Sequence, residues 1–158
     1  MKNILIILSL MSVLSMNGQQ PLYEVTGYAP GFVGKKMILY TYQDYITMTR
    51  IKLGECIVSS DDSLFHIPVK NKTTIKAILH CDKTETEFYL APQTTYDVYF
   101  SEIPNQADGF QTKEADLFFF GLDSTDINYR IIQYNNWFDT YVAYYADSIN
   151  PANFHEYL

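Results

Sequence analysis

Cys56 and Cys81 are the only two cysteines in the sequence, and they are the residues best suited to redox chemistry. A thioredoxin-type site needs two thiols close in sequence at a helix N-terminus, because this position lowers the pKa of the attacking thiol. These thiols lie 25 positions apart (81 minus 56) in segments with strand character, so we expect no disulfide exchange. Buried free thiols are the default interpretation. A structural disulfide is the alternative if a bulge at Gly54 turns Cys56 inward.

The three histidines, His66, His80 and His155, would need carboxylates or thiols to complete a metal site. His80 and Cys81 are neighbours on an expected strand, so their side chains point to opposite faces and cannot easily share one ion. We interpret the histidines as surface residues. The sequence predicts neither a metal site nor a cofactor.

Carboxylates cluster at Asp61-Asp62 and again at Asp82, Glu85 and Glu87. Two well-placed carboxylates can carry acid–base chemistry, but these lie in a turn and along a strand with no flanking catalytic pattern, and we interpret them as solvated turn residues. The sequence also has no Gly-x-Ser-x-Gly and no glycine loop for a phosphate. We therefore predict no catalytic, cofactor-binding or metal-binding residue and no enzyme activity in this segment.

Tyrosines on outward strand positions are the best candidates for a binding surface. Tyr89 and Tyr99 form this set, with Tyr40 and Tyr42 expected nearby. Exposed tyrosines can stack on a sugar or anchor a protein contact, so the predicted partner is an envelope protein or a glycan. The competing interpretation, which we favour, is that a C-terminal helix covers this face.

Short alternating segments separated by turn residues predict that most of the chain is β-structure. The expected fold is mainly β: a small antiparallel β-sandwich, residues 19–103, followed by an α-helical extension. The stretch EFYLAPQTTYDVYF, residues 87–100, is expected to form a hairpin that closes a sheet. The strands are expected at residues 23–28, 37–42, 51–58, 65–69, 75–81, 88–90 and 96–100.

After residue 103 the pattern changes. Residues 104–122 are expected to be a linker with one possible extra strand at 117–122. Apolar residues at steps of three and four then predict an amphipathic helix over 126–146, with Asp123 or Ser124 as its cap. The apolar residues are Ile127, Ile131, Tyr134, Phe138, Tyr141 and Tyr145. Pro151 restarts a helix that stops at Leu158, so we expect the helical extension, 123–158, to be incomplete and the chain to be a fragment of a longer protein.

The N-terminus has the order of a secretory signal peptide. Lys2 precedes an apolar run at Ile4–Leu14, and Gly18-Gln19 is a plausible cleavage point. We therefore expect residues 1–18 to be removed, the rest to be exported to the periplasm or cell envelope, and no later segment to span a membrane. The net charge of −7, with scattered basic residues, argues against a nucleic-acid partner.

Three segments resemble a known family: YEVTGYAPGFVGKKMILY, SSDDSLFHIPV and EFYLAPQTTYDVYF. They are similar to the N-terminal β-sandwich domain of unknown function in envelope proteins of Bacteroidota, which precedes a TlpA-type thioredoxin-like domain or a helical region. The matching positions are Gly27, Gly34-Lys35, the aspartate turn before Phe65, and Leu90, Pro92, Tyr96 and Val98; Gln93 stands where the family has Gly. The resemblance implies a fold and a compartment, but no catalytic residue. The expected function is therefore that of an exported, non-catalytic β-sandwich module of a cell-envelope protein, with a binding or architectural role. The resemblance also implies an alternative function, as the N-terminal accessory domain of a TlpA-like thiol–disulfide oxidoreductase whose thioredoxin domain is absent from this chain.

Overall fold

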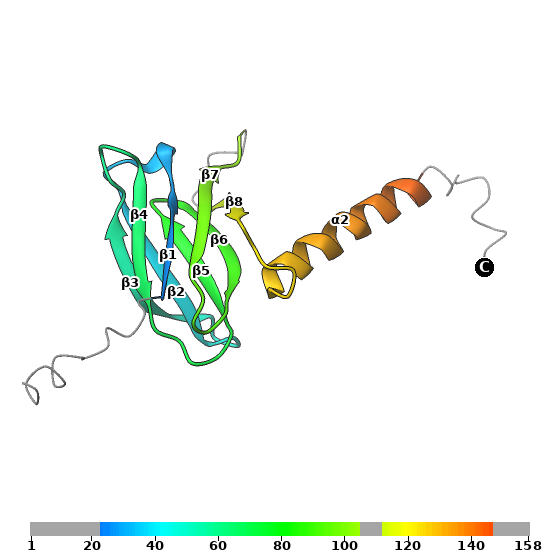
Figure 1. Ribbon diagram of the computed structural model, residues 1–158, viewed down its shortest axis with the longest axis horizontal. Coiled ribbons are helices and arrows are strands. Elements are labelled where there is room, and N and C mark those ends of the chain that lie inside the picture. Colours follow the sequence, from blue (N-terminus) through cyan, green and yellow to red (C-terminus); the bar gives the residue numbers. More distant parts are fainter. Residues whose placement is uncertain (1–22, 105–111, 147–158) are drawn as a thin grey trace, which may run out of the picture.

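The computed structural model describes residues 23–104 and 112–146, and it confirms a mainly β fold followed by a helix (Figure 1). In chain order the elements are β1 (Tyr23–Tyr28), η1 (Pro30–Phe32), β2 (Lys36–Asp44), β3 (Thr49–Ile57), β4 (Leu64–Val69), β5 (Ile75–Cys81), β6 (Thr84–Leu90), β7 (Tyr96–Glu102), β8 (Lys113–Phe120) and α2 (Ile127–Ala146).

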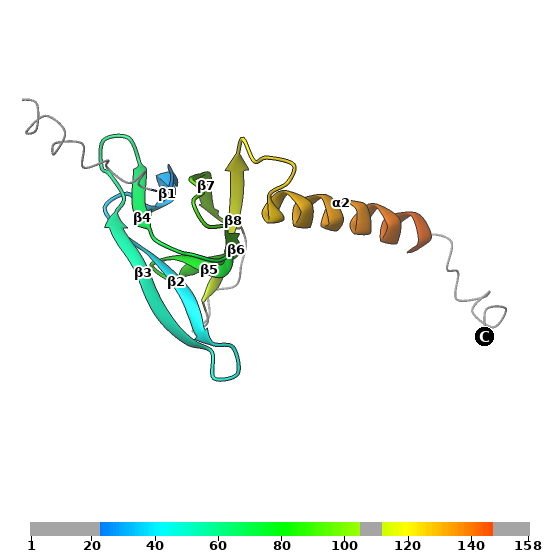
Figure 2. The ribbon, with the colours of Figure 1, turned by 60° about the horizontal axis from the view of Figure 1, so that its bottom comes forward.

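The eight strands form one sheet in the order β3-β2-β5-β6-β8-β7-β1-β4, which curls until its two ends almost meet (Figure 2). The layer β3-β2-β5-β6 joins the layer β8-β7-β1-β4 through only two residue pairs between β6 and β8. At the other side Gly54 of β3 lies so close to Ile67 of β4 that a Cβ at Gly54 would come within 2.6 Å of the Ile67 side chain. The result is a barrel-like sandwich, with parallel pairing at β1–β7 and β6–β8 and antiparallel pairing elsewhere among the described strands.

Inward-facing side chains of both layers fill the space between them. The alternation predicted from the sequence is confirmed at every second residue of β4, β5 and β7. These buried residues are Phe65, Ile67, Val69, Ala77, Leu79, Cys81, Tyr96, Val98 and Phe100.

Gly27 lets β1 lie close to β7 in the parallel pair. A Cβ at this position would lie 2.0 Å from the carbonyl oxygen of Val98, so no larger residue fits without moving one of the two strands. This contact gives a physical reason for the glycine at the end of the first strand.

The prediction that residues 87–100 form a hairpin is wrong. β6 pairs with β5 and β8, whereas β7 pairs with β1 and β8, so β8 separates the two strands. The turn between them carries the chain from one layer to the other instead of reversing it within one layer. The faces were predicted correctly, since Phe88, Leu90, Tyr96, Val98 and Phe100 are all buried.

The possible extra strand exists as β8, which begins four residues earlier than expected, at Lys113, and ends at Phe120. It pairs with β7 over six residues, from Ala115 to Phe120. Gly121, with a φ of 65°, then turns the chain out of the sheet. The segment expected to be a linker therefore supplies the strand that connects the two layers.

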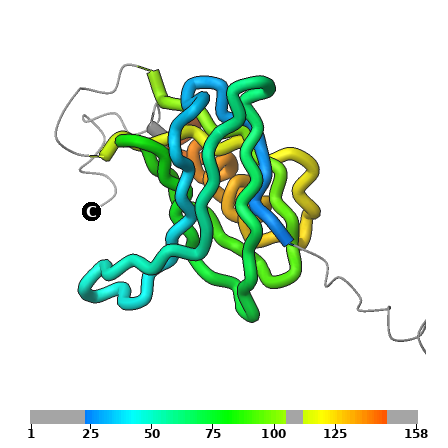
Figure 3. The backbone as a smooth tube through the Cα atoms, turned by 90° about the vertical axis from the view of Figure 1, so that its left-hand side faces the viewer, coloured from blue at the N-terminus to red at the C-terminus, as the bar shows by residue number. Residues whose placement is uncertain are grey.

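The long helix is confirmed over Ile127–Ala146, but it does not cover a sheet face. α2 points away from the sandwich, as Figure 1 shows, and every residue from Arg130 to Tyr145 is exposed. The hairpin of β2 and β3 also extends beyond the body of the sandwich (Figure 3). The expected leader, 1–18, and the expected second helix, 151–158, lie outside the described residues.

Candidate functional site

The outer face of the layer β3-β2-β5-β6 carries a network of polar and aromatic side chains. We call it the charged face; it consists of Tyr40, Tyr42, Arg50, Lys76, His80, Glu85 and Glu87. The strands place these residues side by side because alternate residues of neighbouring strands share a face.

Arg50 of β3 reaches across the sheet to Glu85 of β6. Its guanidinium donates two hydrogen bonds, from Nη1 to Oε2 at 2.7 Å and from Nη2 to Oε1 at 2.9 Å. This bidentate bond lowers the pKa of Glu85 below its usual value. The register places Ile78 on the same face, where it is fully buried although it does not belong to the inner core. We infer that the long polar side chains of the charged face shield it from solvent.

Glu87 occupies the centre of a second set of contacts. It accepts a hydrogen bond of 2.8 Å from the Tyr42 hydroxyl and forms an ion pair with Lys76. Burial alone would raise the pKa of Glu87, but the bonds from Lys76 and Tyr42 outweigh it and the pKa is lowered. The interpretation of Glu85 and Glu87 as solvated turn residues is therefore wrong: both lie within β6 and are paired with cations.

The acidic turn residues match the prediction more closely. Asp61 and Asp62 are exposed, and Asp62 accepts a hydrogen bond from the backbone N–H of Leu64, which supports the turn before β4.

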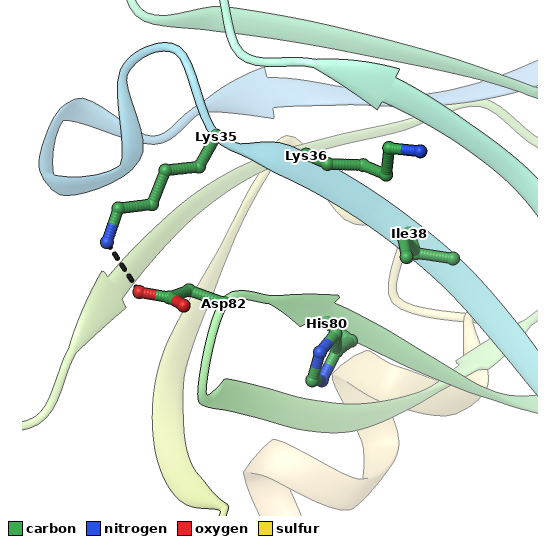
Figure 4. A pocket seen from close by; sticks show the side chains of 5 residues that line it. All are labelled: Lys35, Lys36, Ile38, His80 and Asp82. Atoms are coloured by element: carbon green, nitrogen blue, oxygen red, sulfur yellow. Dashed lines mark hydrogen bonds and ion pairs between the residues drawn. The ribbon is translucent and has the colours of Figure 1, made fainter.

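A shallow hollow of about 420 Å³ adjoins the charged face (Figure 4). Its lining consists of Lys35, Lys36, Ile38, His80 and Asp82. Lys35 and Asp82 form an ion pair across it, with 2.6 Å between Nζ and Oδ2, and this bond lowers the pKa of Asp82. A small ligand in the hollow would have to compete with that ion pair, so we do not regard it as a preformed site.

The two thiols are free, as the default interpretation predicted. Both Cys56 and Cys81 pair with Met37, one from each side of β2, which separates their Cα atoms by about 10 Å, well beyond disulfide reach. The predicted bulge lies beside Gly54 and turns Cys56 toward the core. Burial raises the pKa of Cys81 to about 11, which is the opposite of what thiolate chemistry needs.

The two described histidines lie on the outer faces of different layers. His66 of β4 contacts Thr26 and Glu24, whereas His80 of β5 contacts Glu85 at 3.3 Å. Within residues 23–104 and 112–146, no three His, Cys, Asp or Glu side chains lie close enough together to hold a metal ion. His155 lies outside the described residues.

The predicted tyrosine set divides between the two layers. Tyr40, Tyr42 and Tyr89 lie on the outer face of the layer β3-β2-β5-β6. Tyr99 of β7 lies on the outer face of the other layer. There Tyr99 contacts Tyr28 and Phe118, with ring centroids 5.9 and 6.4 Å apart. The structure therefore does not bring the four tyrosines together, because β6 and β7 belong to different layers.

A polar clamp holds the first turn of α2 against the sandwich. The side-chain amide of Asn128 accepts a hydrogen bond from the Tyr89 N–H at 2.8 Å and donates one to the Tyr89 carbonyl at 2.7 Å, as a neighbouring strand would. The Tyr96 hydroxyl donates to Asp126 at 2.8 Å. Burial, with a smaller effect of Asp126, raises the pKa of Tyr96 to about 12.

Asp126 also caps the helix, because its Oδ1 accepts a hydrogen bond from the Asn128 N–H at 2.7 Å. The predicted caps were Asp123 or Ser124; Asp123 instead supports the preceding turn through Thr125. Sequence reasoning missed the clamp, since Asn128 and its partner Tyr89 are separated by 39 positions and no local pattern connects them.

Beyond the clamp, α2 exposes a continuous set of large apolar side chains. At about 100° per residue they cover roughly 160° of the helix surface. We call it the apolar stripe; it consists of Ile127, Ile131, Tyr134, Trp137, Phe138, Tyr141, Val142, Tyr144 and Tyr145, with exposed fractions from 36% to 72%.

The rings of the stripe contact one another along the helix. The centroids of Trp137 and Tyr141 are 5.6 Å apart, and those of Tyr141 and Tyr145 are 4.4 Å apart. Arg130 and Asp139 are the only charged residues in the 20-residue helix. The helix spacing read from the sequence predicted most of this stripe, but not that it would be open.

No helix in the described part of the chain has the length and apolarity needed to cross a membrane. Comparisons with protein-family models, with curated proteins and with solved structures found no match for this chain. The resemblance to a Bacteroidota envelope domain therefore stays a prediction.

Proposed function

We propose that this chain is an exported, non-catalytic β-sandwich module of the cell envelope whose role is to present α2 as a protein-binding arm. The observation that carries the proposal is the apolar stripe. A surface of this kind on a soluble protein is normally covered by a partner.

The polar clamp supports this role. Asn128 and Asp126 hold the base of α2 on the sandwich, while residues 130–145 of the remaining turns are exposed in the described part of the chain. Because α2 is fixed at its base, it has less conformational entropy to lose when a partner binds, and this favours binding.

The chemistry of the other candidate residues supports a non-catalytic role. The carboxylates of the charged face are paired with Arg50, Lys76 and Tyr42, and both thiols are packed toward the core. For export, the support is the order of residues in 1–18, and mass spectrometry of the mature protein should find an N-terminus near Gln19.

In-cell photo-crosslinking would test the binding arm. A photoreactive phenylalanine analogue replaces Trp137 on the stripe, or Asn136 on the opposite side of the helix as the control. We expect covalent adducts with protein from position 137 and few from position 136. Equal labelling from both positions, or none from either, would refute the proposed role of α2.

A further inference from the structure

The apolar stripe has a size suited to one helix-sized partner. Its six aromatic and three aliphatic side chains, each roughly half exposed, together offer on the order of 800 Å², which is what one partner contributes to an interface of standard size. Of the two charged residues of the helix, Arg130 lies within the arc of the stripe and Asp139 lies outside it, so each copy brings one positive side chain near the N-terminal end of the stripe.

The distribution of side chains along the stripe indicates a particular partner. Its N-terminal half carries the smaller Ile127 and Ile131, and its C-terminal half carries the larger Tyr141 and Tyr145. If a second α2 lies antiparallel with its centre at Asn136, Ile127 faces Tyr145 and Ile131 faces Tyr141 of that copy. Ile127 and Ile131 then face large tyrosines towards the two ends of the pair, and the rings of Tyr134 and Phe138 face each other at its centre.

A parallel arrangement would lack this complementarity. Tyr145 would face Tyr145 and Ile127 would face Ile127, so one end would be crowded and the other would leave a gap. The antiparallel arrangement also places the two sandwiches at opposite ends of helices about 30 Å long, where they do not collide.

A cleft at the base of α2 continues the stripe. It has a volume of about 410 Å³ and is lined by residues of β5, β6, β8 and the first turns of the helix. Phe88, Leu117, Phe119, Ile131 and Ile132 form its apolar part, and Lys76, Glu87, Glu114 and Asp116 add charged side chains. Ile131 belongs to both the cleft and the stripe. In an antiparallel pair the C-terminal turn of the second helix reaches this cleft, so Tyr144 and Tyr145, which have an apolar ring and a polar hydroxyl, would find both apolar and polar side chains beyond the helix itself.

We propose that the partner of α2 is a second copy of this chain. The two helices lie antiparallel and contact each other through the apolar stripe, and the two-fold axis between them crosses the helices at the level of residue 136. This inference rests on the proposed function of α2 as a binding arm. A symmetric interface of this kind uses the same surface on both copies. Because only one short helix and a shallow cleft are buried, we expect an affinity in the micromolar range.

Sedimentation equilibrium of the exported, purified chain tests the stoichiometry. We expect twice the mass of one copy at high concentration and a shift to one copy on dilution. Phe138→Asp in the centre of the stripe should yield single copies, whereas Asn136→Asp on the polar side should leave the pairing unchanged, with the helix content of both variants checked by circular dichroism. A chain that stays single at all concentrations would overturn the proposal.

Engineered cysteines test the orientation without depending on a disruptive variant. Ile131→Cys combined with Tyr141→Cys should give a covalent pair on mild oxidation, since the two thiols of one helix are about 15 Å apart and cannot bond to each other. Either single variant should give little product. Strong cross-linking of a single variant would indicate a parallel pair and overturn the proposal. If the chain is single but position 137 cross-links to a different protein in cells, α2 remains a binding arm and only the second copy is excluded.

Discussion

Phe100 of β7 and Phe138 of α2 carry the same side chain in opposite surroundings. Phe100 is fully buried and packs against Phe32 with 4.9 Å between the tilted rings' centroids, whereas Phe138 is 47% exposed on a helix that points into solvent. In the sandwich, apolar residues find their partners within the chain. In α2 the same kinds of residue stay exposed, and the ring contacts described for them run along the helix itself.

A sequence pattern shows that one face of an element is apolar, but it does not show whether another part of the protein covers that face. Alternation along β7 and helical spacing along α2 both predict one apolar face. The apolar face of β7 is covered because long-range strand pairing assembles the sandwich around it. Among the described residues, no part of the chain covers the apolar face of α2. The sandwich therefore buries its apolar face, whereas α2 leaves its apolar face exposed.

The largest expected effect follows from replacing each phenylalanine in turn. Phe100→Ala should lower the free energy of unfolding by about 3–5 kcal/mol, because it removes a buried ring and leaves a cavity. Phe138→Ala should change it by no more than about 0.5 kcal/mol when measured in urea at low protein concentration, since an exposed side chain is lost. Equal losses at the two positions would mean that Phe138 is packed as closely as Phe100, and the comparison would fail.

The inward faces of the strands were predictable from the sequence because burial repeats at every second residue. Phe65, Ile67 and Val69 show this clearly. The neighbours of each strand were not predictable in the same way. β8 lies between β6 and β7, although it follows them in the chain, and no local feature of residues 87–100 indicates this insertion.

The candidate sites show the same division. The spacing and strand position of Cys56 and Cys81 were enough to argue against a redox pair, and their separation across β2 agrees with that prediction. The contacts of Glu85 and Asn128 were missed, because Arg50 and Tyr89 lie 35 and 39 positions away from them. Such partners become neighbours only when the sheet is assembled.

A second, smaller effect concerns how closely the strands of the sandwich approach. Gly27→Ala should cost about 3 kcal/mol, because its Cβ would lie 2.0 Å from the Val98 carbonyl oxygen and force β1 away from β7. Gly31→Ala is the matched control, since a Cβ there meets no atom within 4 Å, and it should change stability by about 0.5 kcal/mol or less. Urea unfolding of both variants provides the measurement. A Gly27→Ala protein as stable as the control would show that the parallel pair is looser than described.

The smallest expected effect lies at the clamp, where the two regions meet. Asn128→Ala removes both hydrogen bonds to the Tyr89 backbone and should destabilise the base of α2 by about 1 kcal/mol, part of the loss being offset by the higher helix propensity of alanine. Asn136→Ala measures the propensity gain alone, because Asn136 is exposed. This variant should stabilise the helix by a few tenths of a kcal/mol.

Hydrogen exchange followed residue by residue distinguishes these outcomes. In Asn128→Ala the Tyr89 amide should exchange roughly fivefold faster, as about 1 kcal/mol of lost protection implies, while the amides of β4 and β5 keep their wild-type rates. In Asn136→Ala the Tyr89 amide should not change. If Asn128→Ala leaves Tyr89 protected, the contacts of the clamp do not hold the arm, and α2 is joined to the sandwich only through the chain between Gly121 and Asp126. A partner would then have to fix the direction of α2 itself, and binding through the apolar stripe would be weaker than a preset arm allows.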